Sequence, residues 1–139
     1  MISWLTLKNK KLFYKFKQWL AGLINGDGSF LLTKKEYASL EITRDIKNEH
    51  ALQIVKFYYG GSIKLRSNAK TLWYRLHHKD GFLKLIYDVN GNIRNPYRLI
   101  QLNKICLKYN ISLIYPENLT YNNGWFSGFF DVDGIINLN

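Results

Sequence analysis

A ten-residue pattern occurs twice in this chain of 139 residues, and it constrains the fold more than any other feature. Residues 19–28 read Trp-Leu-Ala-Gly-Leu-Ile-Asn-Gly-Asp-Gly, and residues 125–134 read Trp-Phe-Ser-Gly-Phe-Phe-Asp-Val-Asp-Gly. Two copies in register, 106 residues apart, indicate a structural unit that begins twice. Only five residues follow the second copy. We therefore expect one full unit as a first domain over residues 1–115. Residues 116–139 then form a linker and the first helix of an incomplete second unit.

The spacing of apolar residues between the two copies predicts alternating helices and strands. We expect Asp80 to cap one helix and Asn95, which precedes Pro96, to begin another. The predicted fold class is α+β, with a four-stranded antiparallel sheet, helices on one face and the other face free. The predicted helices span residues 11–26, 48–58, 80–87 and 95–109, and the predicted strands span residues 29–35, 37–44, 62–67 and 71–78.

The balance of charges indicates a polyanionic partner. The chain has 20 Lys and Arg against 10 Asp and Glu, a net charge of +10, and a solvated surface does not need this excess. Its 47% of apolar residues exclude a mainly disordered chain. No apolar run approaches the ~18 residues of a membrane-spanning helix. The single cysteine, Cys106, excludes a disulfide framework and is expected to be a core thiol. His50, His77 and His78 lack metal-ligand spacing, so we expect them at the surface or at helix caps.

The free face of the predicted sheet is expected to carry basic and aromatic side chains. If Leu40 and Ile42 face the helices, strand alternation turns the intervening residues outward. A β-ribbon of this kind fits the major groove, where Arg, Lys and polar side chains read base edges. The alternative is an ordinary solvated surface, but Trp73 beside three basic residues favours nucleic acid. The residues predicted to point outward are Thr33, Lys35, Glu41, Thr43, Lys64, Arg66, Trp73, Arg75 and His77.

A second basic cluster precedes the first copy of the pattern. It comprises Lys8, Lys10, Lys11, Lys15 and Lys17. A targeting segment is one explanation for such a cluster. Because the cluster runs directly into the first predicted helix, we interpret it instead as a contact with phosphate backbone.

Residues 20–28 resemble the motif that names the LAGLIDADG homing endonucleases and intron maturases. Residues 126–134 resemble the divergent second motif of two-repeat, single-chain members, and residues 90–104 resemble the stretch between the motifs in organellar members. The sequence departs from the pattern at Asn25, which replaces the first Asp of the motif, and in lacking the body of a second repeat. The resemblance implies an αββαββα unit and a Mg²⁺-dependent, site-specific double-strand DNA endonuclease of intron homing. It also implies a mitochondrial location, which agrees with the abundance of residues that have AT-rich codons.

The repeated motif also predicts a site. Gly22 and Gly26 lie four residues apart and share a helix face that lets another backbone approach, and Gly128 offers a similar surface on the second copy. Close packing would bring Asp27 near Asp133, and two neighbouring carboxylates repel each other unless a cation lies between them. Oxygen ligands of this kind suit Mg²⁺, which polarises a phosphodiester and lowers the pKa of a bound water. The resemblance assigns Asp27 and Asp133 as the catalytic acids and metal ligands.

Other positions around the motif carry less chemistry. A Gly-Asp-Gly sequence after a helix also fits a helix stop with a solvated Asp, but its doubling on a basic chain favours a site. Asn25 and Asp131 are expected to cap or to hydrogen-bond locally. Lys79 and Arg94 are candidates for a basic group of the pocket that no motif fixes.

Two alternative functions stay open on the sequence. One is an RNA maturase that assists the splicing of a group I intron without cutting DNA. The other is a degenerate, non-catalytic module that binds nucleic acid or an assembly. Cutting both strands needs two sheets that flank one pair of motif helices. We therefore expect that this chain is either bound to a second polypeptide or a larger assembly, which would supply the missing half, or binds a half-site only and does not cut alone. No membrane partner is expected.

Overall fold

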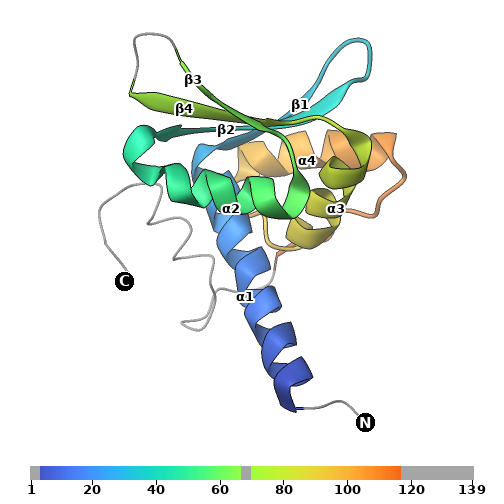
Figure 1. Ribbon diagram of the computed structural model, residues 1–139. Coiled ribbons are helices and arrows are strands. Elements are labelled where there is room, and N and C mark those ends of the chain that lie inside the picture. The colour runs from blue at the N-terminus through green and yellow to red at the C-terminus, as the bar shows by residue number, and fades with distance from the viewer. Residues whose placement is uncertain (1–3, 67–69, 117–139) are drawn as a thin grey trace.

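The computed structural model describes residues 4–66 and 70–116, with side chains from residue 10 onward. Four strands form one antiparallel sheet in the order β1-β2-β4-β3. Figure 1 shows the helices together on one side of this sheet, while no described element covers its other face. The elements are α1 (Trp4–Asp27), β1 (Gly28–Leu32), β2 (Ala38–Asp45), a short 3-10 helix η1 (Ile46–Asn48), α2 (Glu49–Tyr59), β3 (Ser62–Leu65), β4 (Thr71–Leu76), α3 (Lys79–Val89) and α4 (Pro96–Lys108).

The register of the two central strands sorts their side chains onto two faces. Ile42 of β2 lies opposite Tyr74 of β4, and both side chains are fully buried under the helices. The neighbouring pair, Thr43 and Trp73, points to the other face and is only half-buried. The predicted α+β class, with an open sheet face, is therefore confirmed.

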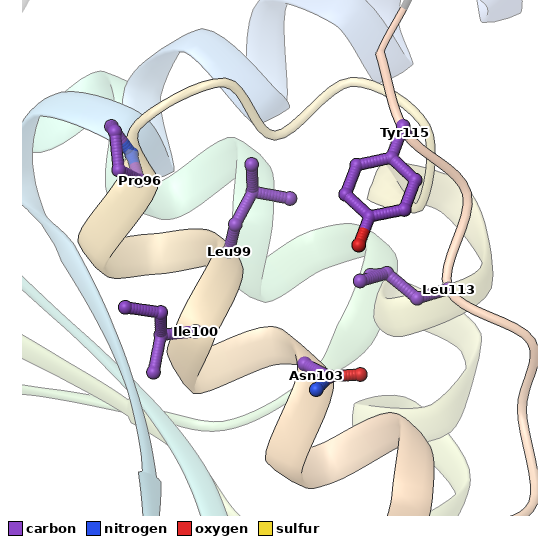
Figure 2. A pocket seen from close by; sticks show the side chains of 6 residues that line it. All are labelled: Pro96, Leu99, Ile100, Asn103, Leu113 and Tyr115. Carbon is purple, nitrogen blue, oxygen red and sulfur yellow. The ribbon is translucent and has the colours of Figure 1, made fainter.

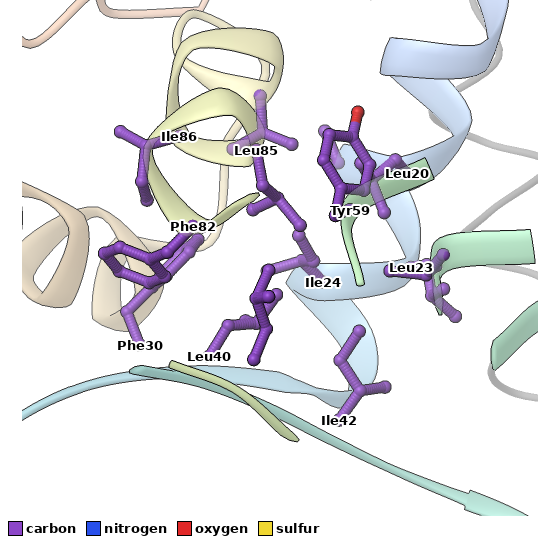
Figure 3. Close-up of a cluster of buried hydrophobic side chains, with 14 of the residues drawn as sticks. Leu20, Leu23, Ile24, Phe30, Leu40, Ile42, Tyr59, Phe82, Leu85 and Ile86 are labelled. Carbon is purple, nitrogen blue, oxygen red and sulfur yellow. The ribbon is translucent and has the colours of Figure 1, made fainter. Parts of the chain in front are cut away.

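The core lies between the sheet and the helices. Figure 3 shows that α1 and α3 direct leucine, isoleucine and phenylalanine side chains onto the inner face of β2. Each fully buried side chain of this size stabilises the fold by about 1.5–3 kcal/mol relative to the exposed state. Cys106 of α4 lies in this core and burial raises the pKa of its thiol, so the predicted core thiol is confirmed. The labelled core residues are Leu20, Leu23, Ile24, Phe30, Leu40, Ile42, Tyr59, Phe82, Leu85 and Ile86.

A polar network ties three of the helices together. The Tyr59 hydroxyl of α2 donates a 2.6 Å hydrogen bond to Oδ2 of Asp88 on α3, and burial together with this bond raises the pKa of Tyr59. The other carboxylate oxygen of Asp88 lies 3.7 Å from Nζ of Lys17 on α1. Lys17 therefore serves the fold as a counter-charge inside the helical layer.

Several predicted boundaries differ from the structure. The strand predicted over residues 29–35 ends at Leu32, because the Thr33 Oγ1 accepts a 3.1 Å hydrogen bond from the Tyr37 N–H and closes a turn there. The last strand ends at Leu76 instead of residue 78. The first helix begins at Trp4 instead of residue 11, because the polar run from Lys8 to Lys11 interrupts the apolar spacing from which the helix is predicted.

One of the two predicted caps is correct. Asn95 precedes α4, and its Oδ1 accepts hydrogen bonds from the backbone N–H groups of Tyr97 and Arg98. The predicted Asp80 cap is wrong, because α3 already begins at Lys79 and His78 holds the N-cap position. Asp80 lies in the first turn, where a carboxylate still interacts favourably with the helix dipole.

The junction of α2 and α3 depends on a glycine. Gly81, in the first turn of α3, lies so close to the end of α2 that a Cβ there would overlap the backbone oxygen of Tyr59 and the ring of His78. A side chain at this position would force the two helices apart.

Gly81→Ala should therefore destabilise the protein by about 1–3 kcal/mol, because overpacking separates α2 from α3. Helix propensity alone would make Gly81→Ala stabilising by about 1 kcal/mol. A loss of stability therefore points to the close approach of the two helices. Urea unfolding measures the change, with Lys56→Ala on the exposed side of α2 as a control. A variant as stable as the wild type would contradict the close approach.

Candidate functional site

The first copy of the motif forms the last turns of α1 and brings Asp27 to their end. Leu20, Leu23 and Ile24 are fully buried, whereas the Asp27 side chain keeps 23% of its surface exposed. Gly28 then turns the chain directly into β1, and a Cβ there would lie 2.9 Å from the Ile24 Cα. The apolar half of the motif thus fixes the helix, and its last carboxylate remains accessible.

Arg44 of β2 is the basic group that the structure places at Asp27. The Arg44 Nε lies 3.9 Å from the Asp27 Oδ2, and the Arg44 side chain is only 2% exposed. A guanidinium is costly to bury unless a carboxylate compensates its charge, so the two groups stabilise each other. Arg44 is not one of the two basic residues proposed for the pocket from the sequence, Lys79 and Arg94. The strand pattern could have identified Arg44, because positions 42 and 44 share the inward face of β2. A charged residue on such a face is rarely found without a partner.

Asn25 joins the end of α1 to the start of α4. Its Oδ1 accepts hydrogen bonds from the backbone N–H groups of Arg94 (2.9 Å) and Asn95 (2.6 Å), and its Nδ2 donates to the Ala21 carbonyl oxygen (2.6 Å). Only the bond to Ala21 is the local one that the sequence predicted, since the other two partners lie 69 and 70 residues away. The side chain is 2% exposed, so it acts in packing and holds in place the turn that carries Asp27.

Trp73 occupies the middle of the open sheet face. It lies opposite Thr43 of β2 and Lys64 of β3. The guanidinium carbons of Arg66 and Arg75 each lie 6.0 Å from the centre of its ring. The structure thus brings together five of the seven side chains predicted to contact nucleic acid.

The other two predicted contacts, Lys35 and His77, lie at one end of the sheet and not on the strands. Lys35 is exposed in the turn between β1 and β2, and His77 is exposed just after β4. Because Leu76 pairs with Leu40, the end of β4 lies beside the start of β2, and both residues belong to the same end. Their predicted place on the strand face is therefore wrong, because both strands end earlier than predicted.

The open face also carries an acid. Glu41 of β2 lies directly opposite Arg75 of β4, with 3.9 Å between Oε1 and Nε. Both side chains are partly exposed, so the pair contributes at most about 1 kcal/mol to stability. Its consequence is electrostatic, because a partner on this face meets a positive surface with a negative charge near its centre.

The second copy of the motif lies outside the described residues. Asp133, Asp131 and Gly128 therefore have no structural account, and the pairing of Asp27 with Asp133 stays a prediction. On α1, Gly22 is buried and Gly26 is half-buried.

Asp27 offers the kind of donor that Mg²⁺ prefers, a carboxylate oxygen at a partly exposed position. Within residues 4–66 and 70–116, no cluster of three or more His, Cys, Asp or Glu side chains could hold a metal ion. A cation at Asp27 would take further oxygens from outside this part of the protein. None of the helices in the same part is both long and apolar enough to cross a membrane.

A shallow apolar groove lies elsewhere, between α4 and the segment that follows it (Figure 2). Its volume is about 280 Å³, and the six described residues that line it carry no charge. Its described lining has no carboxylate, imidazole or thiol, and the Tyr115 hydroxyl is its one titratable group, so it is a weaker candidate active site than Asp27.

The sequence model of the LAGLIDADG endonuclease family matches residues 20–112, which is most of the described fold. The chain belongs to the LAGLIDADG endonuclease family. Two similar proteins are the intron-encoded RNA maturase bI4 of Saccharomyces cerevisiae, 55% identical over 123 residues, and the probable intron-encoded endonuclease aI2 of Debaryomyces hansenii, 45% identical over 124 residues. These matches cover 88% and 89% of this chain but only 19% of each relative.

The fold of this family member is similar to that of a solved family nuclease. The LAGLIDADG meganuclease I-AabMI, whose structure holds uncleaved DNA, matches with a TM-score of 0.61 at 20% sequence identity. The match covers 84% of this chain and 56% of that chain. The described residues therefore have the LAGLIDADG fold, and they match part of the longer I-AabMI chain.

Asn25→Ala should lower the free energy of unfolding by roughly 2–4 kcal/mol, because it leaves two backbone N–H groups without their acceptor. Hydrogen exchange at the Arg94 and Asn95 amides should accelerate at the same time. Asn103→Ala, at an exposed position of α4, is the matched control. Unchanged exchange at the two amides would show that Asn25 does not hold this junction.

Proposed function

We propose that this chain is a DNA-binding and catalytic repeat of a site-specific homing endonuclease encoded in a mitochondrial intron. The observation that carries the proposal is the combination of a basic, tryptophan-centred open sheet face with a carboxylate at the C-terminal end of α1. Figure 1 shows that this end of α1 meets the sheet. A duplex on the open face and a reacting phosphate near Asp27 are therefore compatible with one binding event.

The open face has the chemistry that a DNA duplex requires. Lys64, Arg66 and Arg75 neutralise phosphates, which supplies the larger, sequence-independent share of affinity. Thr43 and Glu41 lie beside Trp73 and Arg75 on the neighbouring strand β2, where polar groups reach base edges in the major groove. Lys35 and His77 extend the polar surface beyond one end of the sheet.

The chemistry proposed at Asp27 is metal-assisted hydrolysis of a phosphodiester. Asp27, with Asp133 as its proposed partner, would hold Mg²⁺, which when bound polarises the phosphodiester and lowers the pKa of a bound water. Arg44 keeps the Asp27 carboxylate in place and compensates its charge. Each sheet covers half of a long site, so we propose that cutting both strands requires a second sheet, supplied by another polypeptide or a larger assembly.

RNA maturation is a second candidate function. The relative with 55% identity over 123 residues is named an RNA maturase. Group I intron RNA is therefore a proposed partner beside duplex DNA, and its binding does not require Asp27.

Asp27→Asn should abolish any cleavage and also lower the free energy of unfolding, because it removes the carboxylate that compensates the buried charge of Arg44. At a temperature where the variant is folded, the dissociation constant for duplex DNA should change less than about twofold, because the sheet serves recognition. Nicking and linearisation of a plasmid that carries the intron-less host gene, with and without Mg²⁺, measure cleavage, and gel shifts in Ca²⁺ measure binding. Glu49→Gln, at an exposed position of α2, makes the same change of charge and should cut like the wild type. Undiminished cutting by Asp27→Asn would remove the catalytic assignment.

The affinity for duplex DNA should fall steeply as salt concentration rises, because binding releases counterions. Lys64→Ala and Arg66→Ala should each reduce the slope of log Kd against log salt by ~1. Glu41→Gln should act in the opposite direction and tighten binding to random duplex DNA, because it removes the acid beside Arg75. Fluorescence anisotropy at several salt concentrations measures all three variants. A flat salt response would exclude nucleic acid as the partner of this face.

A further inference from the structure

The basic cluster that precedes the motif lies far from the sheet. Lys15 and Lys11 precede Asp27 by 12 and 16 residues on one continuous helix, which corresponds to about 18 Å and 24 Å at 1.5 Å per residue. Figure 1 shows that α1 runs away from the sheet and that its N-terminal half projects beyond the other helices. The Debye length at physiological salt is about 8 Å. These lysines therefore contribute little to the binding of a duplex on the open sheet face.

This end of α1 is strongly positive, and no acid of the described residues compensates its charge. Lys10, Lys11 and Lys15 are exposed, and none of them joins an ion pair within residues 4–66 and 70–116, whereas Lys17 pairs with Asp88. No Asp or Glu precedes Asp27 in the sequence. Lys11 and Lys15 also lie four residues apart on the same helix face, and like charges at this spacing destabilise a helix. The cluster thus works against the helix that carries it, which indicates a role other than folding.

The aromatic residues of this segment divide between two roles. The ring of Phe13 stacks on Phe16, and Phe16 in turn contacts Tyr58 of α2, while Phe13 itself stays 37% exposed. Tyr14 is 59% exposed and lies one turn after Lys10 and Lys11. The outward surface therefore combines lysines with an accessible aromatic ring. Leu12 and Phe13 are exposed as well, so a comparison with lipid vesicles is needed to separate RNA binding from a membrane contact.

We propose that the N-terminal half of α1, through Lys10, Lys11, Lys15 and Tyr14, is a second nucleic-acid-binding surface, and that it takes structured RNA with unpaired bases. Lysines contact the phosphates of such an RNA, and an exposed aromatic ring stacks on a base that is splayed out of a loop, which duplex DNA does not offer. This surface is independent of the sheet, so RNA and duplex DNA occupy the protein at the same time. The inference deepens the second candidate function and does not depend on cleavage at Asp27.

The test compares two triple variants of the full chain. Lys10→Ala/Lys11→Ala/Lys15→Ala removes the proposed surface and keeps good helix formers, so circular dichroism should be unchanged. Lys47→Ala/Lys56→Ala/Lys104→Ala removes the same charge from exposed positions on other helices. The probes are a labelled RNA hairpin with an unpaired loop and a labelled DNA duplex of similar length.

The first triple variant should weaken hairpin binding at least tenfold, with a salt slope smaller by about 2–3, and change duplex binding less than twofold. The control triple should weaken both probes by less than threefold. Tyr14→Leu should weaken binding of the hairpin but not of a fully paired RNA. Saturating duplex DNA should leave the hairpin bound to the wild type.

Three outcomes would overturn the inference. Displacement of the hairpin by duplex DNA would show that the sheet binds both nucleic acids. Equal loss of hairpin binding in the two triple variants would show that binding depends on the net charge of the protein and not on this surface. If the wild type binds phosphatidylserine vesicles but not the hairpin, and the Lys10→Ala/Lys11→Ala/Lys15→Ala variant does not bind the vesicles, the surface is a membrane contact. Each of these results leaves the test of the sheet, through Lys64 and Arg66, unaffected, so the failure of one proposal is distinguishable from the failure of the other.

Discussion

The end of α1 is held by contacts from three separate parts of the chain, and the site depends on all of them. Asn25 binds the backbone at Arg94 and Asn95, Arg44 compensates the charge of Asp27, and Gly28 lets the chain turn tightly against Ile24. The result is a carboxylate whose position is set by buried groups although the carboxylate itself is reached by solvent. Preorganisation of this kind is what a catalytic acid requires.

Strand pairing sets the open face as firmly as packing sets the core. Thr43, Trp73 and Lys64 form one row across three strands, and Glu41 and Arg75 belong to the next row. A shift of register by one residue would turn Trp73 inward and Tyr74 outward, so burial of Tyr74 fixes the composition of the binding face. The alternation of side chains along β2 and β4 thus determines both the buried core and the residues on the open face.

The sequence was sufficient for the layers of the fold and for the position of Asp27. Periodicity predicted four helices and four strands in the correct order, because burial on one face leaves a regular pattern. It could not predict that β1 ends at Leu32, since the hydrogen bonds of the turn from Thr33 to Tyr37 leave no periodic signal. It also missed the long-range contacts of Asn25, whose partners lie about seventy residues away, and the contact of Arg44 with Asp27. Charged and polar residues at inward positions are where pattern alone fails, because their partners are chosen by the fold.

The burial of Arg44 ties the residue to which we assign the proposed chemistry, Asp27, to the stability of the fold. A lineage that abandons cutting has no further use for the acid, yet replacing it with an apolar residue strands a positive charge that is 2% exposed. Genetic drift at position 27 is therefore restrained even after selection for cleavage ends. A relative that has lost the acid at position 27 should also carry a substitution at position 44. Relatives that no longer cut DNA should therefore differ from this chain at both positions.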